Sequence, residues 1–244
     1  MRIVYIIATL MVGACAWQLA SGTLPAPADV MSALATLWNE RGLFDQLSSS
    51  LALNVEAIAW STAITLALAY ATVVPAVRPL VAGLTKLRFT GMVGWGFVLT
   101  LVTSSGHQLK LWMLVFGMTP FFLTAMAAVV AEIPKERFDH ARTLGMSEPR
   151  VVWEVVIRGT LDKAFETLRQ NAAMGWMMLT TVEGVVRSEG GIGAMLLDEN
   201  KHLALDAVFA LILVVLLVGV AQDYALAYLR RLACPYADLA KERR

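Results

Sequence analysis

Cysteine and charge are both scarce in this chain of 244 residues. Two cysteines are too few for a disulfide-stapled secreted module. A net charge of +1 provides no overall field that would attract nucleic acid. Charged residues make up 16% of the chain and hydrophobic residues 58%, whereas an average soluble domain has about 25% and about 45–50%. The apolar excess excludes a disordered chain and favours a membrane protein.

Catalytic motifs are absent as well. The chain has no Gly-x-x-x-x-Gly-Lys-Ser/Thr segment and therefore no phosphate-binding loop of its own. Neither Gly-x-Ser-x-Gly nor His-Glu-x-x-His occurs. His107, His140 and His202 fall in three different predicted loops, on two sides of a membrane, and cannot form one metal site. We expect no catalytic residue, no metal and no cofactor.

What the chain does contain is a series of apolar segments, most of them close to the roughly 20 residues that span a bilayer. They predict a single all-α domain over 1–244 with six transmembrane helices. The third segment is short and rich in glycine, and the fifth is weak because it carries charged and amide side chains. The six segments are residues 3–19, 51–74, 89–103, 109–131, 164–182 and 205–229.

The remaining parts of the chain are predicted to lie outside the bilayer core. Residues 29–38 form a short amphipathic helix at the membrane surface, and residues 184–203 form a glycine-bearing loop. The glycines of residues 91–96 favour close helix packing over nucleotide binding. For residues 3–19 we favour an uncleaved membrane helix; a cleaved signal peptide is the alternative.

Lysine and arginine are distributed unevenly between the two sides of this topology. With the N-terminus inside, 16 of the 20 fall on the inside, and Arg41, Lys110, Arg187 and Lys201 fall on the outside. Membrane proteins concentrate basic residues on the cytoplasmic side. The distribution predicts a multi-pass inner-membrane protein with both termini in the cytoplasm. It also requires the weak fifth segment to cross, since otherwise the basic C-terminal tail would lie outside.

Residues 132–158 are polar and read as helix, turn, helix. Phe138, Ala141 and Leu144 recur on one side of the first helix, which Gly145 is placed to end with a left-handed residue. Ser147 can cap the second helix. Two short amphipathic helices outside the membrane need an apolar surface to cover them. Either the ends of the protein's own membrane helices or a partner protein could supply it.

This stretch resembles the cytoplasmic coupling loop of type I binding-protein-dependent ABC importer permeases. Their pattern is Glu-Ala-Ala, three residues, then Gly; here Asp139-His140-Ala141 and Arg142-Thr143-Leu144 precede Gly145. Three segments are similar to the corresponding segments of the nitrate/sulfonate/taurine branch of that family. They are residues 142–147, 24–30 and 188–193.

The resemblance implies the type I permease fold with cytoplasmic coupling helices. Two permease copies, as a homodimer in the bilayer, would form the path for a small anion such as nitrate, a sulfonate or taurine. Two separate ABC ATPase subunits would bind the coupling helices, and a periplasmic or lipid-anchored solute-binding protein would deliver the solute. No nucleic acid is implied. The residues that would contact the ATPase are Phe138, Asp139, Ala141, Leu144 and Gly145.

The sequence departs from the family pattern at three positions. Asp139 and His140 stand in place of Glu and Ala, and Asp139 could simply pair with Arg142 three residues later. Arg158 stands where the family usually has proline. We therefore expect the second coupling helix to continue into the fifth segment without a break.

Polar residues of the fifth segment recur along one helical stripe and are predicted to line the translocation path. The stripe consists of Arg169, Ala173, Trp176, Thr180 and Glu183, and the candidate path residues on it are Arg169, Trp176, Thr180 and Glu183. Alternatively, Arg169 extends to the inner membrane surface and Glu183 lies in a solvated loop. Glu56 of the second segment could line the path or sit at the interface.

Two other functions compete with a permease. One is an unrelated membrane scaffold or channel without ATPase coupling. The other is an intramembrane enzyme that uses Glu183 or Asp206 with a histidine. An enzyme would need a catalytic pair at one depth, and the sequence indicates none.

Overall fold

The computed structural model describes residues 24–235. The first predicted membrane segment, residues 3–19, lies outside them, as does the end of the basic tail. The described residues form helices and connecting turns, without strands. In chain order the helices are α2 (Pro27–Glu40), α3 (Leu43–Ala71), η1 (Pro75–Val77), α4 (Arg78–Thr85), η2 (Lys86–Phe89), α5 (Met92–Thr100), α6 (Gly106–Ala131), α7 (Lys135–Thr143), α8 (Glu148–Val151), η3 (Val152–Arg158), α9 (Gly159–Val185), η4 (Arg187–Glu189), α10 (Ile192–Lys201) and α11 (Leu205–Ala233).

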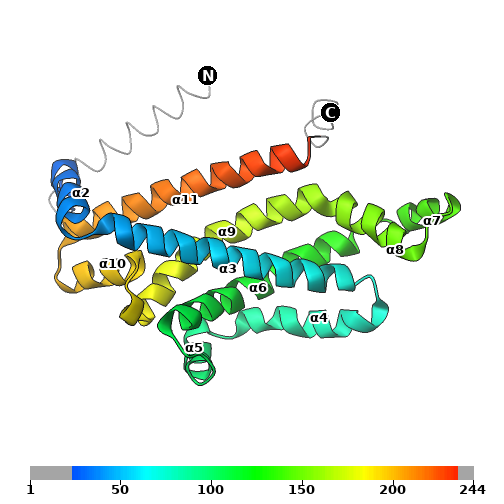
Figure 1. The fold of residues 1–244 in the computed structure, drawn as a ribbon, viewed down its shortest axis with the longest axis horizontal. Helices are drawn as coiled ribbons and strands as arrows, with labels where there is room; N and C mark the ends of the chain where they lie inside the picture. Colours follow the sequence, from blue (N-terminus) through cyan, green and yellow to red (C-terminus); the bar gives the residue numbers. More distant parts are fainter. Residues whose placement is uncertain (1–23, 236–244) are drawn as a thin grey trace.

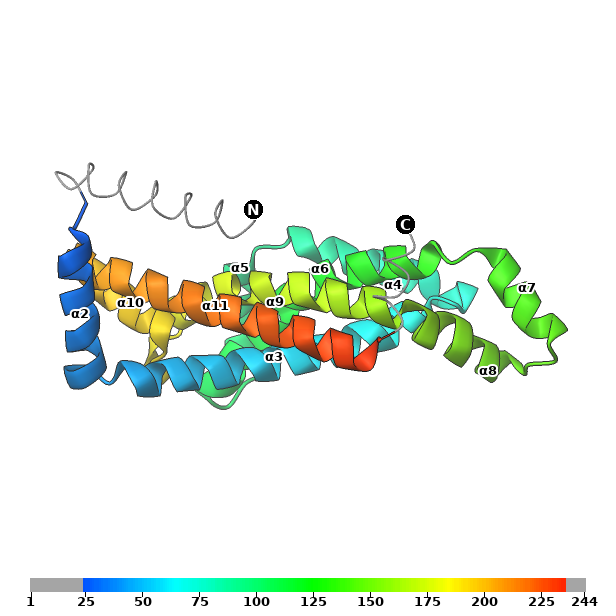
Figure 2. The same ribbon diagram turned by 90° about the horizontal axis from the view of Figure 1, so that it is seen from above.

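Four long helices make an elongated bundle (Figure 1). Helices α3, α6 and α11 run toward the end that carries α7 and α8, called here the α7 end. Helix α9 runs in the opposite direction, toward the end formed by α2 and α10, called here the α10 end. Helix α2 lies across the α10 end, and α7 with α8 extends beyond the bundle at the other (Figure 2).

Among the described helices, α3, α6 and α11 are long and apolar enough to cross a membrane. They correspond to the second, fourth and sixth predicted segments. Helix α9 contains the fifth segment, and its 27 residues would extend about 40 Å. Because α9 carries charged side chains, length and apolar composition alone do not identify it as a membrane-spanning helix. The predicted loop of residues 184–203 is partly wrong, because ten of its residues form the helix α10.

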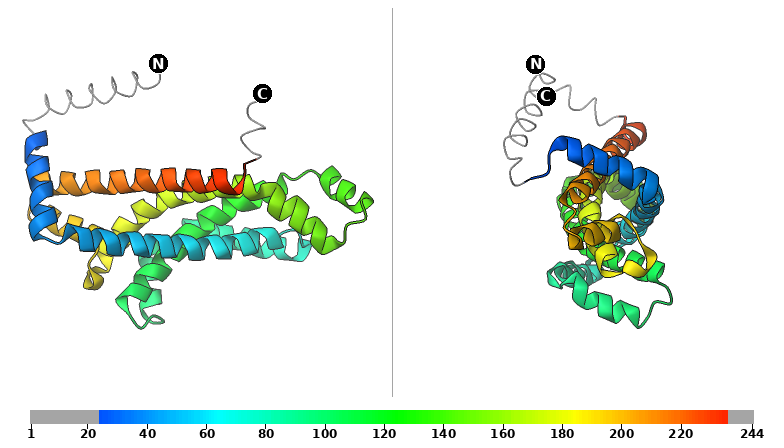
Figure 3. Two further views of the ribbon diagram at one scale, coloured as in Figure 1. Left: turned by 45° about the horizontal axis from the view of Figure 1, so that its top comes forward. Right: turned by 90° about the vertical axis from the view of Figure 1, so that its left-hand side faces the viewer.

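The third predicted segment, residues 89–103, is not a continuous spanning helix. Only Met92–Thr100 is helical there, and nine residues extend about 14 Å. Thr90 and Gly91 are extended, and glycine weakens a helix by about 1 kcal/mol per residue relative to alanine. Because α3 and α6 run in the same direction, the chain must return between them. It does so in pieces, through α4, η2 and α5, and α5 projects sideways from the bundle (Figure 3).

Helix α2 is amphipathic, as predicted, but it is longer than expected and packs on the protein. Val30, Ala33 and Leu37 are buried against the start of α11 and α10. Trp38, at the end of the predicted helix, is 51% exposed and contacts the ring of Phe44 edge-on.

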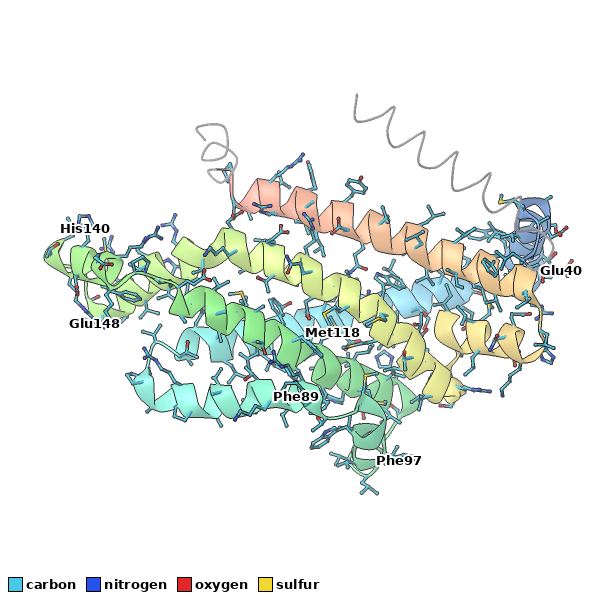
Figure 4. The ribbon with its side chains drawn as sticks, turned by 180° about the vertical axis from the view of Figure 1, so that it is seen from behind. Glu40, Phe89, Phe97, Met118, His140 and Glu148 are labelled. Carbon is cyan, nitrogen blue, oxygen red and sulfur yellow. The ribbon has the colours of Figure 1, made fainter. Side chains whose placement is uncertain are left out.

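The main core lies where α3, α6 and α9 meet, around the fully buried Met118 (Figure 4). Small residues allow the helices to approach closely. A Cβ atom on Gly175 would lie 3.0 Å from the Asn54 side chain and 3.1 Å from Met118. In the predicted glycine cluster, only Gly96 has such a neighbour, because a Cβ there would lie 3.0 Å from Met113.

Candidate functional site

Helix α7 and the turn after it have the predicted helix-turn-helix form. The amide of Gly145 donates to the Arg142 carbonyl, and the amide of Met146 donates to the Ala141 carbonyl. This pair of bonds closes the helix only if the residue between adopts a left-handed conformation, and Gly145 has φ +76°. Ser147 occupies the N-cap position of α8, but its side chain makes no capping hydrogen bond. The turn is fixed mainly by Gly145.

The five predicted coupling residues divide into buried and exposed groups. Ala141 is buried and Phe138 is half-buried, so both face the protein. Leu144 is 62% exposed. Gly145 and Asp139 are also exposed. The loop therefore presents Leu144, Gly145 and Asp139 outward from the end of the molecule.

Arg142 of α7 pairs with Glu148 of α8 as well as with Asp139 of its own helix, and it therefore links the two helices. Its guanidinium donates two hydrogen bonds to Glu148, at 2.8 and 3.1 Å, and a longer one of 3.4 Å to Asp139. The hydrogen bond with Arg142 lowers the pKa of the Glu148 carboxyl and raises that of the guanidinium. His140 and Glu148 lie at this far end of the molecule in Figure 4. Asp139 is the weaker of the two partners of Arg142, and its side chain is largely exposed and can make another contact.

Helix α8 continues directly into α9, as predicted from Arg158. Residues 148–185 are helical throughout, with the seven residues of η3 wound as a π-helix. Arg158 pairs with Glu154 one turn earlier, at 3.1 Å. Thr160 donates to the Val156 carbonyl and lies 3.4 Å from the Tyr70 hydroxyl of α3. A displacement of α8 can therefore pass along one helix into the bundle.

Arg169 is held between α9 and α11. Its Nε lies 2.7 Å from Asp223 of α11, and one terminal nitrogen lies 3.6 Å from Glu166. Arg230 of α11 binds Asp162 at 2.6 Å and Glu166 at 3.2 Å. These two arginines and three carboxylates, called here the α9–α11 ion network, leave Arg169 without an unbalanced positive charge.

Trp176 and Glu183 are buried inside the bundle rather than exposed along the predicted stripe. The Trp176 indole donates to Gln222 of α11 at 2.8 Å, and Asn54 of α3 donates to the same oxygen at 3.1 Å. Thr180 is partly exposed. The predicted stripe is on one helix, but these four residues do not share one open surface of it.

Glu183 anchors the glycine-rich segment at the α10 end. Its carboxylate accepts a hydrogen bond from the Gly193 amide at 2.8 Å and from the Ser50 hydroxyl at 2.6 Å. Ser50 in turn accepts from the Ile192 amide at 2.9 Å, and Gln46 from the Gly191 amide at 2.5 Å. We call this arrangement the Glu183 latch. Three successive amides at the start of α10 are thus satisfied by side chains of α3 and α9.

The latch also depends on glycine. A Cβ atom on Gly193 would collide with the backbone of Thr180, so α10 lies directly on α9 there. Lys110 of α6 donates to the Gly190 carbonyl at 2.6 Å. The segment 188–193 therefore has a structural reason for its glycines.

The residues that sequence reasoning missed are the buried amides of the bundle. Gln222 joins α3, α9 and α11, and neither the amide nitrogen nor the amide oxygen of Asn171 has a hydrogen-bond partner in the described residues. An amide inside an otherwise apolar segment is the signal that could have identified them. The open face of α9 is formed by Gln170, Ala173, Met177 and Thr181, and of these only Ala173 belongs to the predicted stripe.

Other predicted candidates are placed as follows. Glu56 lies on α3, 3.2 Å from His107 of α6, with both side chains about half exposed. Within residues 24–235, no group of three or more His, Cys, Asp or Glu is arranged to hold a metal ion.

Comparison with known proteins matches the part of the chain from α6 to α11, which includes the α7 turn and α9. The model of a family described as "Binding-protein-dependent transport system inner membrane component" matches residues 106–233, from α6 to the end of α11. The taurine transport system permease protein TauC of Escherichia coli is 29% identical over 117 residues, which is 48% of this chain and 42% of that protein. The bicarbonate transport system permease protein CmpB of Synechocystis is 24% identical over 106 residues, 43% of this chain and 38% of that protein.

A putative ABC transporter permease protein of Methanocaldococcus jannaschii is 24% identical over 110 residues, 45% of this chain and 41% of that protein. The matched region thus spans less than half the length of each of these relatives. The resemblance drawn from the loop motif is confirmed.

Proposed function

The chain belongs to the family of binding-protein-dependent transport system inner membrane components, and from this premise we propose that it is the membrane-spanning permease subunit of an ATP-driven importer. The observation that carries the proposal is the α7 turn, which buries Ala141 while it presents Leu144 and Gly145 outward. An exposed apolar residue on a short helix beyond the bundle is suited to a groove on another protein. The same surface has no evident use in a scaffold or channel that acts alone.

We propose that two ABC ATPase subunits bind this turn in a complex with two copies of the chain. A separate solute-binding protein would deliver the solute at the α10 end. ATP-driven closure of the ATPases would move α7 and α8, and the continuous helix 148–185 would transmit that movement to the translocation path. No catalytic step is assigned to this chain.

The proposed topology has six crossings and both termini in the cytoplasm of an inner-membrane protein. Residues 3–19 would make the first crossing, α3, α6, α9 and α11 four others, and the pieces α4, η2 and α5 together the third. Two observations support it: the 16 basic residues on the predicted inner side, and the arrangement of α11, which runs toward the α7 end (Figure 1).

For the translocation path we propose the open face of α9. Met177 on this face is 64% exposed, and Gln170, Ala173 and Thr181 accompany it. Thr180 and Arg169 would contribute from its edges, while Trp176 and Glu183 would act by holding α9 in place. For the solute we propose a small anion such as nitrate, a sulfonate or taurine, because one relative is named for taurine and another for bicarbonate.

The experiment exchanges Leu144 for glutamate in a tagged chain that is purified from its own cell membranes. We expect the wild-type chain to bring an ABC ATPase with it, identified by mass spectrometry and ATP hydrolysis. Leu144→Glu should lose that ATPase, because a carboxylate would enter the ATPase groove without a partner.

The matched control is Met31→Glu on α2, at the opposite end of the molecule. Met31 is 61% exposed, against 62% for Leu144, so the two changes disturb the fold equally little. The control should retain the ATPase. A wild-type chain that purifies without any ATPase would favour the scaffold or channel, and an ATPase retained by Leu144→Glu would refute the proposed contact.

A further inference from the structure

Two hollows lie next to each other between α3, α4 and α6. The first, at the α7 end, has a volume of about 690 Å³. Its charged and polar borders include Arg78, Lys135 and Arg142, and apolar side chains such as Val81 and Val130 form the rest of its wall. The second, of about 260 Å³, is bounded by leucine and other apolar side chains, including Leu68, Leu84 and Leu123. We call them the polar hollow and the apolar hollow.

The two hollows follow one another along the same helices. On α3, Leu68 of the apolar hollow is one turn from Thr72 of the polar hollow. On α6, Leu123 of the apolar hollow adjoins Thr124 of the polar hollow. On α4, Leu84 of the apolar hollow adjoins Thr85 of the polar hollow. The broken third crossing produces this arrangement, because short α4 does not cover the gap between α3 and α6. A ligand entering at the α7 end would meet polar groups first and an apolar slot beyond them.

The polar hollow has an excess of positive charge. Arg78, Lys135 and Arg142 border it, and Asp139 is the one carboxylate among its bounding residues. Asp139 already faces Arg142, which also binds Glu148. In the described part of the chain, neither Arg78 nor Lys135 lies within ion-pair distance of a carboxylate; Arg78 donates only to the Thr72 carbonyl, at 2.9 Å. The hollow is therefore suited to an anion.

A cationic hollow next to an apolar one limits the class of ligand that can fill both. A free anion would neutralise Arg78 and Lys135 but leave the apolar hollow empty. An uncharged acyl chain would fill the apolar hollow but leave the two cations unpaired. We propose that an anionic phospholipid binds here, with its phosphodiester between Arg78 and Lys135 and part of one acyl chain in the apolar hollow.

This lipid would be part of the coupling apparatus rather than a passive neighbour. Phe138, Asp139 and Arg142 of the coupling loop border the same polar hollow. The headgroup would thus contact α7 directly and favour one position of it relative to α4 and α6. The inference rests on the proposed cytoplasmic location of the α7 end, where the inner leaflet supplies anionic lipids.

The test is native mass spectrometry of the purified full chain after equilibration in mixed micelles of phosphatidylglycerol and phosphatidylcholine. The wild type should retain phosphatidylglycerol in preference to phosphatidylcholine. Arg78→Gln combined with Lys135→Gln should weaken that retention by about 30-fold, since each basic residue contributes about a factor of five near an anionic lipid. The double variant Arg78→Lys, Lys135→Arg keeps both charges and should restore most of the retention.

The matched control is Lys86→Gln combined with Arg88→Gln. It removes two exposed cations from the adjacent η2, and neither borders the polar hollow. Retention of phosphatidylglycerol should not change. Equal loss in this control would mean that the lipid responds only to overall charge, which would overturn the site.

Two further arms decide between a lipid and a free anion. Leu84→Trp fills the apolar hollow and should reduce retention, whereas millimolar inorganic phosphate should displace little lipid from the wild type. Full displacement by phosphate, with no effect of Leu84→Trp, would overturn the lipid in favour of an anion site. Retention without preference for phosphatidylglycerol would overturn it altogether. None of these readouts involves the ATPase, so the site and the proposed coupling contact can fail separately.

Discussion

The two ends of the molecule are stabilised in opposite ways. At the α10 end, Glu183 and Ser50 are buried, and they bind successive amides of Ile192 and Gly193. At the α7 end, the ion pair of Arg142 with Glu148 is exposed to solvent. Buried, fully paired polar groups are stiff and resist removal, whereas exposed ion pairs contribute little. The comparison indicates a fixed α10 end and a movable α7 end, which agrees with the proposed ATPase contact at the α7 end.

The largest effect is expected from Glu183→Ala, which breaks the latch. The Gly193 amide and the Ser50 hydroxyl would lose their acceptor inside the protein. Hydrogen bonds to a buried charge contribute about 1.5–3 kcal/mol each. We expect the free energy of unfolding in detergent to fall by about 3 kcal/mol. Denaturant unfolding followed by Trp fluorescence measures it.

Asp198→Ala is the control for the latch, because Asp198 is an exposed carboxylate on the neighbouring α10. That variant should unfold within experimental error of the wild type. If Glu183→Ala unfolded as the wild type does, the α10 end would not be fixed by the latch and the comparison would fail.

A smaller effect is expected from Arg230→Met, which removes one arginine from the α9–α11 ion network. The side chains of this network are intermediate in exposure between the buried latch and the exposed Arg142–Glu148 pair. The change leaves Asp162 and Glu166 facing each other without Arg230, although solvent partly screens them. We expect the free energy of unfolding to fall by about 1–2 kcal/mol. The exposed neighbour Arg231→Met provides the control. Equal effects of the two variants would show that the network adds nothing.

A still smaller effect is expected at the α7 end from Gly145→Ala. A non-glycine residue in the left-handed region loses about 1 kcal/mol, and Gly145 has φ +76°. Gly83→Ala is a close control, because a Cβ atom at either position would have no neighbour within 4 Å. Gly145→Ala should speed hydrogen exchange in α7 while global unfolding stays unchanged. Gly83→Ala lies inside the helix α4, so it should leave exchange in α7 unchanged and should not destabilise the protein. Loss of global stability in Gly145→Ala would mean that the α7 end is not independently movable.

The sequence predicted the parts of the fold that depend on local signals. Long apolar composition identified α3, α6 and α11. The spacing of Phe138, Ala141 and Leu144 before Gly145 predicted α7 and its left-handed end, and Arg158 in place of proline predicted continuous helix. Each of these follows from residues close together in the chain, so each can be read without knowledge of the tertiary fold.

The sequence could not predict which face of α9 is covered. Helical periodicity places Trp176 and Glu183 on one stripe, but their partners decide their burial. Those partners are Gln222 and Ser50, which lie 46 and 133 residues away in the chain. The third crossing was mispredicted for a different reason. Hydropathy registers the apolar side chains near Gly91 and Gly96 but not the weakness of a glycine-rich helix.

The smallest effect is expected from the Arg142–Glu148 pair, and it concerns pH. The hydrogen bond from Arg142 lowers the pKa of the Glu148 carboxyl below its ordinary value of 4.5. An opened loop therefore binds a proton more readily than the closed loop does just below pH 4.5. The contribution of the pair is fully present above that pH and is lost as the pH falls through the lowered pKa.

We accordingly expect amide protection at residues 142–148 to be flat at neutral pH and to decrease in acid, beginning below 4.5. Hydrogen exchange, corrected for its intrinsic pH dependence, measures this. Glu148→Gln should remove the acid-dependent step, because its amide does not titrate, whereas Glu136→Gln on the exposed first turn of α7 should leave it in place. Global unfolding should not change in either variant. An acid step that survived in Glu148→Gln would assign the fastening of α7 to another contact, and the movable end would then be held by packing around Ala141 rather than by an exposed ion pair.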